Sequence, residues 1–416
     1  MLRKCHTVQI KMMVCSLALY AADKRAIFFR FGEWLRGRAS MRTQTVRNFA
    51  LASAISCIAI FARPGFALEP LQGPQTKPGS AIGASAGALP PGIYMVNYLF
   101  YYGFQLTGPG VLPGPQITPR GYAIEDEQAF LFVPGWSFLG GTYTAYLAFP
   151  FVAESAESAL EAGVPGHPPV PFPGVSRSGV HNTFIAPIRL HWSLGNGFFV
   201  QAGAGVHVPD GTTGGPLGDS NVGADYFTFQ PNFVLSYFKE GWNLTAYAYY
   251  EINTKNQRSG YRTGDIFHVD LTATKKFGKW TIGPVGYYVA QTTSDSPGAN
   301  FDAALTTAFS SAFMCGPGCV PFHGFNAGKF EAFAVGGLVG YDFGPATLTV
   351  WATDEVFART HGGFSGAPSF VAAVLGTSEI PFVTDTTTKG WSVFARLTYQ
   401  LWGPESPPPQ KPIVPK

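Results

Sequence analysis

From Ile93 onward, the chain consists of segments in which apolar and polar residues alternate. Alternation with a period of two indicates β-strands that have one apolar and one polar face. In the segment 266–276, the apolar residues Phe267, Val269, Leu271 and Ala273 alternate with His268, Asp270, Thr272 and Thr274. In the segment 184–194, the predicted apolar face holds Phe184, Ala186, Ile188, Leu190, Trp192 and Leu194, opposite Arg189, His191 and Ser193. A tilted strand needs about 9–11 residues to cross a bilayer, and these segments are long enough.

The connections between the segments alternate in length. Tight turns are expected at 195–197, 239–241, 278–279 and 344–346. Long polar or Gly/Pro-rich loops are expected at 107–121, 155–181, 209–224, 255–264, 292–331 and 359–389. A soluble β-sandwich would also contain alternating strands. Short turns that alternate with long loops are instead typical of outer-membrane barrels, whose turns are periplasmic and whose loops are external.

We therefore predict an all-β fold, a closed antiparallel transmembrane β-barrel of about 12 strands over residues 92–402. Closure is required because an open sheet edge would leave unpaired backbone groups in hydrocarbon. The strands are expected at 93–106, 122–133, 142–154, 182–194, 198–208, 225–238, 242–254, 265–277, 280–291, 332–343, 347–358 and 390–402. An even number of strands returns both chain ends to the periplasm. The expected location is the bacterial outer membrane.

Composition supports this fold class and excludes others. Charged residues make up 13% and aromatic residues 15% of the chain, whereas soluble domains carry roughly 25% charged residues. The predicted barrel region has no apolar run of about 20 residues, which a membrane-spanning helix would need. The formal net charge is +3, and no basic stripe with interleaved aromatic residues indicates nucleic-acid binding.

The N-terminal part of the chain predicts export. A positively charged stretch at 41–47 precedes an apolar stretch at 49–61, and small residues stand before Leu68. Residues 41–67 are therefore predicted to be a secretory signal peptide. Residues 1–40 are expected to be an upstream extension outside the native protein, with a long basic leader as the alternative.

Two flanking segments have a composition unlike that of the strands. Residues 68–91 are rich in Gly, Ala and Pro. They are expected to form a disordered periplasmic segment or, as the alternative, a plug inside the lumen. The Pro-rich residues 403–416 are expected to form a periplasmic tail.

The sequence contains five cysteines. Three of them lie before Leu68, in segments expected to be absent from the mature protein. The remaining pair, Cys315 and Cys319, stands in a Gly/Pro turn (CGPGC). In an exported protein, such an isolated pair is more often a disulfide than a metal site. His323 is a weak candidate partner, so we expect a disulfide and no metal.

Several short motifs follow one another along the predicted barrel. The stretch 253–256 (NTKN) is followed by 261–264 (YRTG), 268–270 (HVD), 286–288 (GYY) and 291–293 (QTT). The stretches 89–94 (LPPGIY) and 225–231 (DYFTFQP) precede them. Together these motifs resemble the outer-membrane protein family named for the meta-pathway of phenol degradation, over about residues 88–402. The stretch 180–183 (VHNT) departs from the family pattern. The resemblance implies a transporter-like barrel that passes aromatic or other hydrophobic compounds. The family name refers to a pathway and does not establish an enzymatic step.

Polar residues on the inner face supply the candidate site. The residues predicted to line the lumen and contact a solute are Arg189, His191, Tyr247, Tyr249, Glu251, His268, Asp270 and Arg396. The tyrosines offer flat apolar surface, and a histidine beside carboxylates could polarise a phenolic ligand. The alternative is a hydrogen-bonded network that fills and stiffens the lumen, with Arg189 or Arg396 as charge partners of the carboxylates.

The function expected from these observations is an outer-membrane channel or transporter for small hydrophobic or aromatic compounds, with no catalytic residue and no cofactor. A barrel of about 12 strands is intermediate between filled eight-stranded barrels and open porins, which predicts selective or gated transport. One alternative is a structural or surface-recognition barrel. Another is a lipid hydrolase, which needs a serine nucleophile with a histidine base, and the sequence has no strong serine motif. Expected partners are outer-membrane lipid, the solute and the barrel-assembly machinery, but not nucleic acid.

Overall fold

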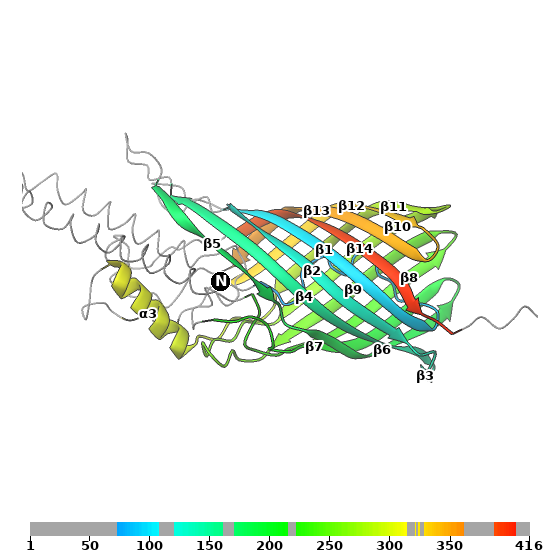
Figure 1. Ribbon diagram of the computed structural model, residues 1–416, viewed down its shortest axis with the longest axis horizontal. Helices are drawn as coiled ribbons and strands as arrows, with labels where there is room; N and C mark the ends of the chain where they lie inside the picture. Colours follow the sequence, from blue (N-terminus) through cyan, green and yellow to red (C-terminus); the bar gives the residue numbers. More distant parts are fainter. Residues whose placement is uncertain are drawn as a thin grey trace, which may run out of the picture. The chain divides into compact units, whose positions relative to one another are not determined.

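The computed structural model describes residues 73–107, 120–160, 170–214, 222–313, 321, 323–324, 328–361 and 387–404. They all belong to one compact unit and form an antiparallel sheet that closes on itself (Figure 1). Twelve strands make the ring: β1 (Gly92–Thr107), β2 (Arg120–Val133), β4 (Gly141–Leu160), β6 (Phe184–Gly195), β7 (Phe198–His207), β8 (Thr228–Lys239), β9 (Trp242–Asn253), β10 (Ile266–Phe277), β11 (Trp280–Gln291), β12 (Lys329–Asp342), β13 (Ala346–His361) and β14 (Thr387–Trp402). The predicted signal peptide and the cysteine pair lie outside the described residues.

The last strand closes the ring by pairing with the first. β14 bonds β1 along a register that runs from Trp402 opposite Ile93 to Thr387 opposite Thr107. On its other side β1 bonds β2, and β2 bonds β4. The predicted closed antiparallel barrel of twelve strands is therefore confirmed. It includes β2, which contains the acidic residues 125–127.

Two predicted loops contain secondary structure. The predicted loop 155–181 is largely a hairpin, because β4 continues to Leu160 and β5 (Val170–Val180) pairs back onto it. The predicted loop 292–331 contains the helix α3 (Ala299–Phe313). The hairpin carries polar cross-strand pairs, such as Glu154 with Arg177 at 2.7 Å. Outside the bilayer a strand needs no apolar face, so apolar periodicity could not reveal this hairpin. A two-residue strand, β3 (Ser137–Phe138), also pairs with β4.

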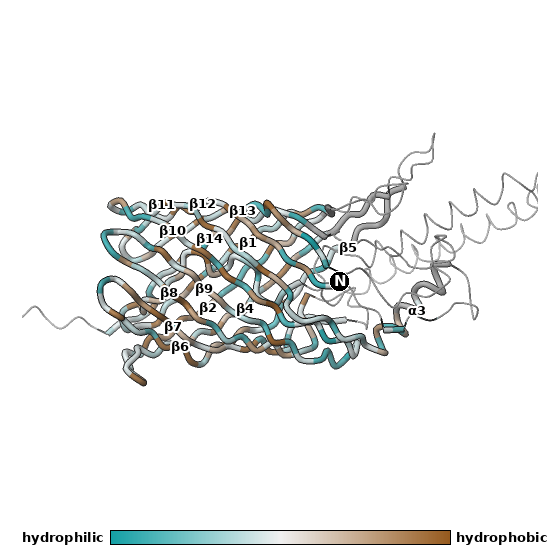
Figure 2. Tube along the Cα trace, turned by 180° about the vertical axis from the view of Figure 1, so that it is seen from behind, coloured by the Kyte–Doolittle hydropathy of each residue, from teal (hydrophilic) through white to brown (hydrophobic). Residues whose placement is uncertain are grey.

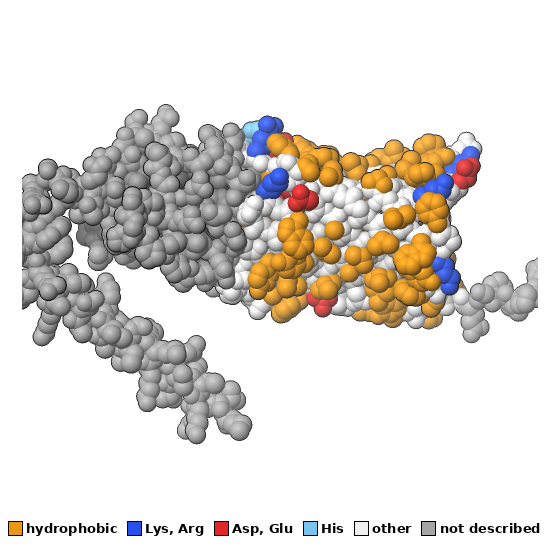
Figure 3. Space-filling model, turned by 90° about the horizontal axis from the view of Figure 1, so that it is seen from above, with side chains coloured by type: hydrophobic (Ala, Val, Ile, Leu, Met, Phe, Trp, Pro, Cys, Tyr) orange, Lys and Arg blue, Asp and Glu red, His pale blue; other side chains and the backbone are white. Residues whose placement is uncertain are grey.

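The outer face of the ring is apolar. On β8, Phe229 and Phe233 are exposed. Gln230 and Asn232, which lie between them in the sequence, are buried in the interior. Hydrophobic and hydrophilic residues are mixed along the strands (Figure 2). Apolar side chains spread over the outer face shown in Figure 3, and charged side chains lie mainly toward its ends. An apolar exterior with a polar interior is the arrangement of an outer-membrane β-barrel, and this is what the protein is.

Aromatic residues stand at the short-turn end of this apolar face. Trp242, Trp280 and Trp402 are exposed there, the last with 58% of its surface. Such residues form the interfacial girdle of a membrane protein. The tight turns have positive φ at Gly241, Gly278 and elsewhere, a conformation that glycine adopts without strain. Within the described residues, no helix is both long enough and apolar enough to span a membrane.

The predicted lipid face of β6 is correct at its end and wrong at its start. Phe184 and Ala186 line the interior cavity instead of the lipid face. The strand register shifts between Ile185 and Ile188, so the alternation of faces changes its phase there. Pro187, which has no N–H to pair, lies within this irregular stretch. Beyond it, Arg189 and His191 point inward as predicted.

At the opposite end, described loop residues pack against one another. The side chain of Asn182 bonds both the N–H and the C=O of Ala224, each at 2.9 Å. The buried Asp295 carboxylate accepts hydrogen bonds from the Tyr261 hydroxyl at 2.5 Å and from the Gly264 N–H at 2.7 Å. We call these five residues the loop cap. Their side-chain to backbone bonds hold together loops that are far apart in sequence.

A pair of neighbouring residues on β14 tests the assignment of the two faces. Leu397 is 36% exposed on the outer face, and Thr398 lines the interior cavity. Leu397→Arg should lower the free energy of unfolding by about 2–4 kcal/mol, because the guanidinium would enter hydrocarbon. Thr398→Arg adds the same charge to the same strand and should cost much less. Reversible unfolding in lipid vesicles measures both, and equal losses would mean that the faces of β14 are reversed.

The loop cap should respond to pH through Asp295. Burial raises the pKa of Asp295 to about 7 from 3.8, although Tyr261, Gly264 and Arg262 act to lower it. A raised pKa means that the folded cap holds the proton more tightly than the unfolded loop does. The stability of the cap should therefore be greatest below pH 3.8 and decline as the pH rises to about 7. Asp295→Asn should remove this dependence, measured by hydrogen-exchange protection of the Gly264 amide. If the protection of the Gly264 amide still depended on pH in this variant, a titrating group other than Asp295 would be responsible.

Candidate functional site

Residues 73–91, here called the lumen segment, run through the interior of the barrel. Their backbone N–H groups donate to side chains on one wall. Glu251 on β9 accepts from two successive N–H groups, at 3.2 and 2.7 Å. Asp270 on β10 accepts from Gly79 and Ala81, at 3.1 and 2.8 Å. Two further N–H groups follow the same wall, from Gly83 to Thr272 at 2.8 Å and from Ala86 to Ser236 at 2.9 Å.

Other walls donate to the carbonyl groups of the same segment. The three donors are the Trp351 indole to Gly79 at 3.1 Å, the Arg396 guanidinium to Ile82 at 3.2 Å, and the His191 ring Nδ1 to Ala86 at 2.9 Å. The segment is thus hydrogen-bonded through both its N–H and its C=O groups, to strands on different sides of the barrel. These bonds replace those that regular secondary structure would supply.

Glycine is required at two positions of the lumen segment. Gly79 and Gly83 have φ values of +84° and +72°, which side chains other than glycine rarely adopt. A Cβ on Gly79 would also meet the Tyr287 ring at 2.9 Å, and a Cβ on Gly83 would meet Arg396 Nη2 at 2.9 Å. The small residues of this segment let its backbone approach the wall closely.

The structure places all eight predicted site residues on the inner side of the barrel and gives them different contacts. Four of them bond the lumen segment: His191, Glu251, Asp270 and Arg396. Arg189 donates to Gln201 Oε1 at 3.1 Å and to the Tyr247 hydroxyl at 3.3 Å. Tyr249 stacks on His268 with ring centres 4.3 Å apart. Their contact with a solute stays a prediction.

The expected pairing of Arg189 or Arg396 with the carboxylates is not found among the described residues. Glu251 and Asp270 accept backbone N–H groups of the lumen segment, and His268 Nε2 lies 3.6 Å from Glu251 Oε1. The reason is distance along the chain. The N–H donor at Gln75 is 176 residues before Glu251, and strand periodicity carries no information about such a partner.

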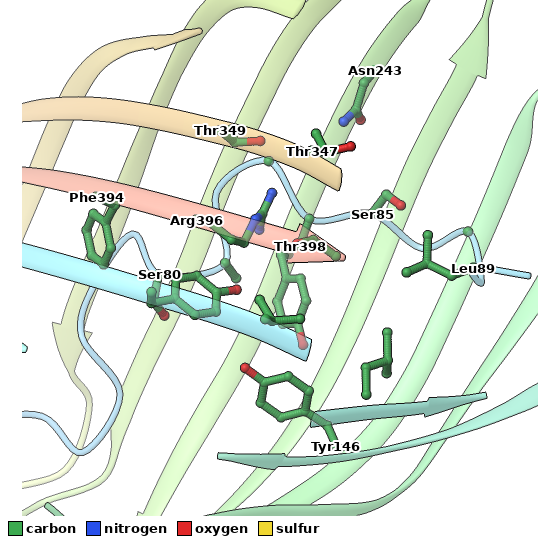
Figure 4. Close-up of a pocket in the computed structure, with 18 of the residues that line it drawn as sticks. Ser80, Ser85, Leu89, Tyr146, Asn243, Thr347, Thr349, Phe394, Arg396 and Thr398 are labelled. Atoms are coloured by element: carbon green, nitrogen blue, oxygen red, sulfur yellow. The ribbon is translucent and has the colours of Figure 1, made fainter. Parts of the chain in front are cut away.

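A cavity of about 750 Å³ lies between the lumen segment and the barrel wall. Ser80, Ser85 and Leu89 border it from the segment, while Tyr146 and Arg396 border it from strands of the wall (Figure 4). The lining continues to the short-turn end, where residues 239–241 contribute. The lining also reaches His207 and Gln230, near the long-loop ends of β7 and β8, so the cavity extends along most of the lumen segment.

Sequence reasoning missed several residues of this cavity. Glu125 and Glu127 on β2 line it. Lys77 of the lumen segment lies 3.6 Å from the Glu125 carboxylate, and the Tyr146 hydroxyl donates to Glu127 at 3.0 Å. Tyr98 on β1 lines it as well. The alternation of β2 could have placed both glutamates inside, because they stand two residues apart on one face of the strand. The plug alternative for residues 68–91 would have placed Lys77 in the lumen, but no sequence pattern indicated its pairing with Glu125.

Ser193 and His191 on β6 are not arranged as the serine nucleophile and histidine base that a lipid hydrolase needs. The Nε2 atom of His191 lies 2.9 Å from Thr144 Oγ1, and its Nδ1 donates to the Ala86 carbonyl. Ser193 is exposed at the end of the strand. Among the described residues, no cluster of three or more His, Cys, Asp or Glu side chains could hold a metal ion.

Solved structures of similar architecture include an outer-membrane channel from Pseudomonas putida F1, with 10% identity and a TM-score of 0.45 over 78% of this chain and 99% of that chain. A FadL homologue from Pseudomonas aeruginosa has 11% identity and a TM-score of 0.33, over 82% of this chain and 98% of its own. A deletion mutant of TodX, a monoaromatic hydrocarbon channel, has 8% identity and a TM-score of 0.36, over 78% and 94%. No curated protein sequence matches the chain.

The sequence also matches a family model. The matched region spans residues 108–370, which is more than half of the chain. It includes the motif stretches from 225 to 293 that carried the resemblance described above. The chain belongs to the protein family described as "Putative MetA-pathway of phenol degradation".

Proposed function

We propose that this protein is a gated outer-membrane channel for small hydrophobic and aromatic compounds, and that it is not an enzyme. The observation that carries the proposal is the cavity of about 750 Å³ enclosed between the lumen segment and the barrel wall. An apolar cavity of about 150 Å³ already accommodates benzene, so this space has room for a monocyclic solute. The description of the family, which names phenol degradation, supports the same class of compound.

The lining of the cavity suits an aromatic solute. Tyr98, Tyr146 and Phe394 present ring faces and edges to the space, and aromatic rings attract one another in offset or edge-to-face contacts. Threonines such as Thr349 and Thr398 add hydroxyl groups, which can bond a phenolic oxygen. A compound of this kind crosses the polar outer leaflet poorly, so a protein path through the membrane would speed its entry.

The lumen segment is the proposed gate. It lies along the route through the barrel and is held by hydrogen bonds that each contribute about 0.5–1.5 kcal/mol net, or about 1.5–3 kcal/mol where the acceptor is a charged carboxylate. Such bonds can be exchanged for bonds to water or solute without unfolding the barrel. In this proposal Glu251 and Asp270 hold the gate, while Arg189 and Tyr247 line the route and contact the solute.

Removing the anchors of the lumen segment should open the channel. Glu251→Ala and Asp270→Ala each delete the acceptor of two backbone N–H groups. The time-averaged conductance of the channel in planar bilayers should rise in both variants, because the segment would be displaced for a larger fraction of the time.

A buried glutamate elsewhere in the lumen serves as the control. Glu355 accepts hydrogen bonds from Tyr102, Tyr287 and the Gly390 N–H, all in the barrel wall. Glu355→Ala should disturb the wall without raising the conductance. The gating role would be contradicted by equal conductance in the two anchor variants and the parent protein.

Uptake of solute by cells tests the function itself. Cells that make the protein should take up radiolabelled phenol faster than cells without it, at concentrations so low that passive entry limits the rate. A linear alkane of similar mass should show a smaller difference, because it cannot stack on tyrosine. Equal uptake of every compound, with the barrel present in the outer membrane, would favour the structural or surface-recognition alternative.

A further inference from the structure

The interior of the barrel contains two arginines that have no carboxylate partner among the described residues. Arg189 donates to an amide and a tyrosine, and its buried Nε atom has no hydrogen-bond partner there. Arg396 donates to one backbone carbonyl. Charges in a protein interior are normally paired, because the loss of hydration costs several kcal/mol per ion. Both guanidinium groups border the cavity, so an anion in the cavity could pair with them.

The two arginines are the ends of a row of side chains that crosses four neighbouring pairs of strands. Tyr98 on β1 stands opposite Arg396 on β14 and opposite Glu127 on β2. The Tyr146 hydroxyl on β4 donates to Glu127, and Arg189 on β6 lies over the Tyr146 ring. We call these five residues the cavity row. Cation, aromatic ring, carboxylate, aromatic ring and cation follow one another along one side of the cavity.

Each arginine of the cavity row lies beside an aromatic ring. The Arg189 guanidinium is 5.7 Å from the centre of the Tyr146 ring. The Arg396 guanidinium is 5.8 Å from the centre of the Tyr98 ring and 5.3 Å from that of Trp351. These contacts hold the planar groups without using up their N–H donors. A ligand with a flat ring and a planar anionic group would meet both surfaces at once.

The charges around the cavity also favour an anion. Its lining has five basic side chains, Lys77, Arg189, Lys239, Lys276 and Arg396, and three acidic ones, Glu125, Glu127 and Glu240. Lys77 lies beside Glu125 at 3.6 Å and Lys276 bonds Asp342 at 2.8 Å, so the excess of positive charge rests mainly on the two arginines. Glu127 is the carboxylate within the row and would repel an anion, so the anionic group is expected at one of the arginine ends, away from Glu127.

We propose that the cavity row is a binding site for aromatic carboxylates, with the carboxylate on Arg189 or Arg396 and the ring on the adjacent tyrosine. This inference rests on the proposed function, because it assumes that the cavity lies on the solute route. It narrows the solute class from small hydrophobic and aromatic compounds to aromatic compounds that carry a carboxylate. Arginine suits the task because its fork of N–H donors matches the geometry of a carboxylate.

Calorimetric titration of the full-length purified barrel tests the site with three probes of similar shape. Benzoate is aromatic and anionic, benzamide is its neutral counterpart, and cyclohexanecarboxylate is an anion without an aromatic ring. Benzoate should bind more tightly than either of the others. Arg189→Gln should weaken benzoate binding by on the order of tenfold, as expected for the loss of a charge-assisted hydrogen bond, and should weaken benzamide binding much less.

Two further variants separate the site from charge and folding effects. Arg359→Gln removes a positive charge that pairs with Glu331 and does not border the cavity, so benzoate binding should be retained. Arg396→Lys keeps the charge at the other end of the row and should keep the preference for benzoate over benzamide. Arg396 also holds the lumen segment through Ile82. Lysine is therefore substituted at this position, because it keeps the positive charge, whereas an uncharged residue would remove both the charge and this contact.

The outcomes distinguish the two proposals. Equal binding of benzoate and benzamide, with no effect of Arg189→Gln, would overturn the carboxylate site and leave the channel for neutral aromatic compounds standing. Both proposals would be overturned if no probe bound and if cells with and without the protein took up phenol at the same rate. Tight binding of benzoate and cyclohexanecarboxylate alike would contradict the role of the tyrosine rings.

Discussion

Where water is absent, the backbone N–H and C=O groups must find hydrogen-bond partners within the protein. This requirement governs both the wall and the interior of the barrel. In the bilayer, every strand must pair on both sides, and the pairing of β14 with β1 meets that demand. In the interior, the lumen segment has no strand partner. Its N–H groups donate hydrogen bonds to Glu251 and Asp270, and its carbonyl groups accept hydrogen bonds from Trp351 and Arg396. The polar inner faces of the strands therefore bind a piece of the chain itself.

This arrangement explains why charged side chains can line a narrow lumen. A carboxylate inside a barrel is costly unless donors surround it, and backbone N–H groups are suitable donors because they are neutral and closely spaced. Glu251 and Asp270 each gain two of them. The arginines are then left without carboxylates and stand against aromatic rings. The same distribution that fixes the lumen segment thus leaves cationic groups facing the cavity.

The lumen is divided between the lumen segment, which is hydrogen-bonded to the wall, and the cavity, which is open. This division relates the fold to the proposed transport. The segment follows the wall formed by β8, β9 and β10. The open part lies beside Tyr98 and Tyr146 and also reaches the short turns at 239–241. A solute in the cavity would touch the segment through Ser80 or Ser85. In the proposed channel, binding of a solute and movement of the segment would therefore be coupled, because the segment forms one wall of the cavity.

The sequence by itself determined the barrel, because the alternation of Phe229 and Phe233 with Gln230 and Asn232 repeats in nearly every strand and depends on local spacing alone. It also identified the inward-facing candidates correctly wherever the strand was regular. It failed at Phe184 and Ala186, since a bulge beside Pro187 changes the phase of the alternation.

What the tertiary structure alone decided is which inward residues meet one another. Glu251 lies 176 residues from the N–H group that it accepts, and the cavity row joins five strands through their register. Strand periodicity assigns a residue to a face, but contacts across the lumen depend on barrel closure and stagger. The contacts of Arg189 and Arg396 are therefore set by barrel closure and stagger, and the sequence pattern does not contain them.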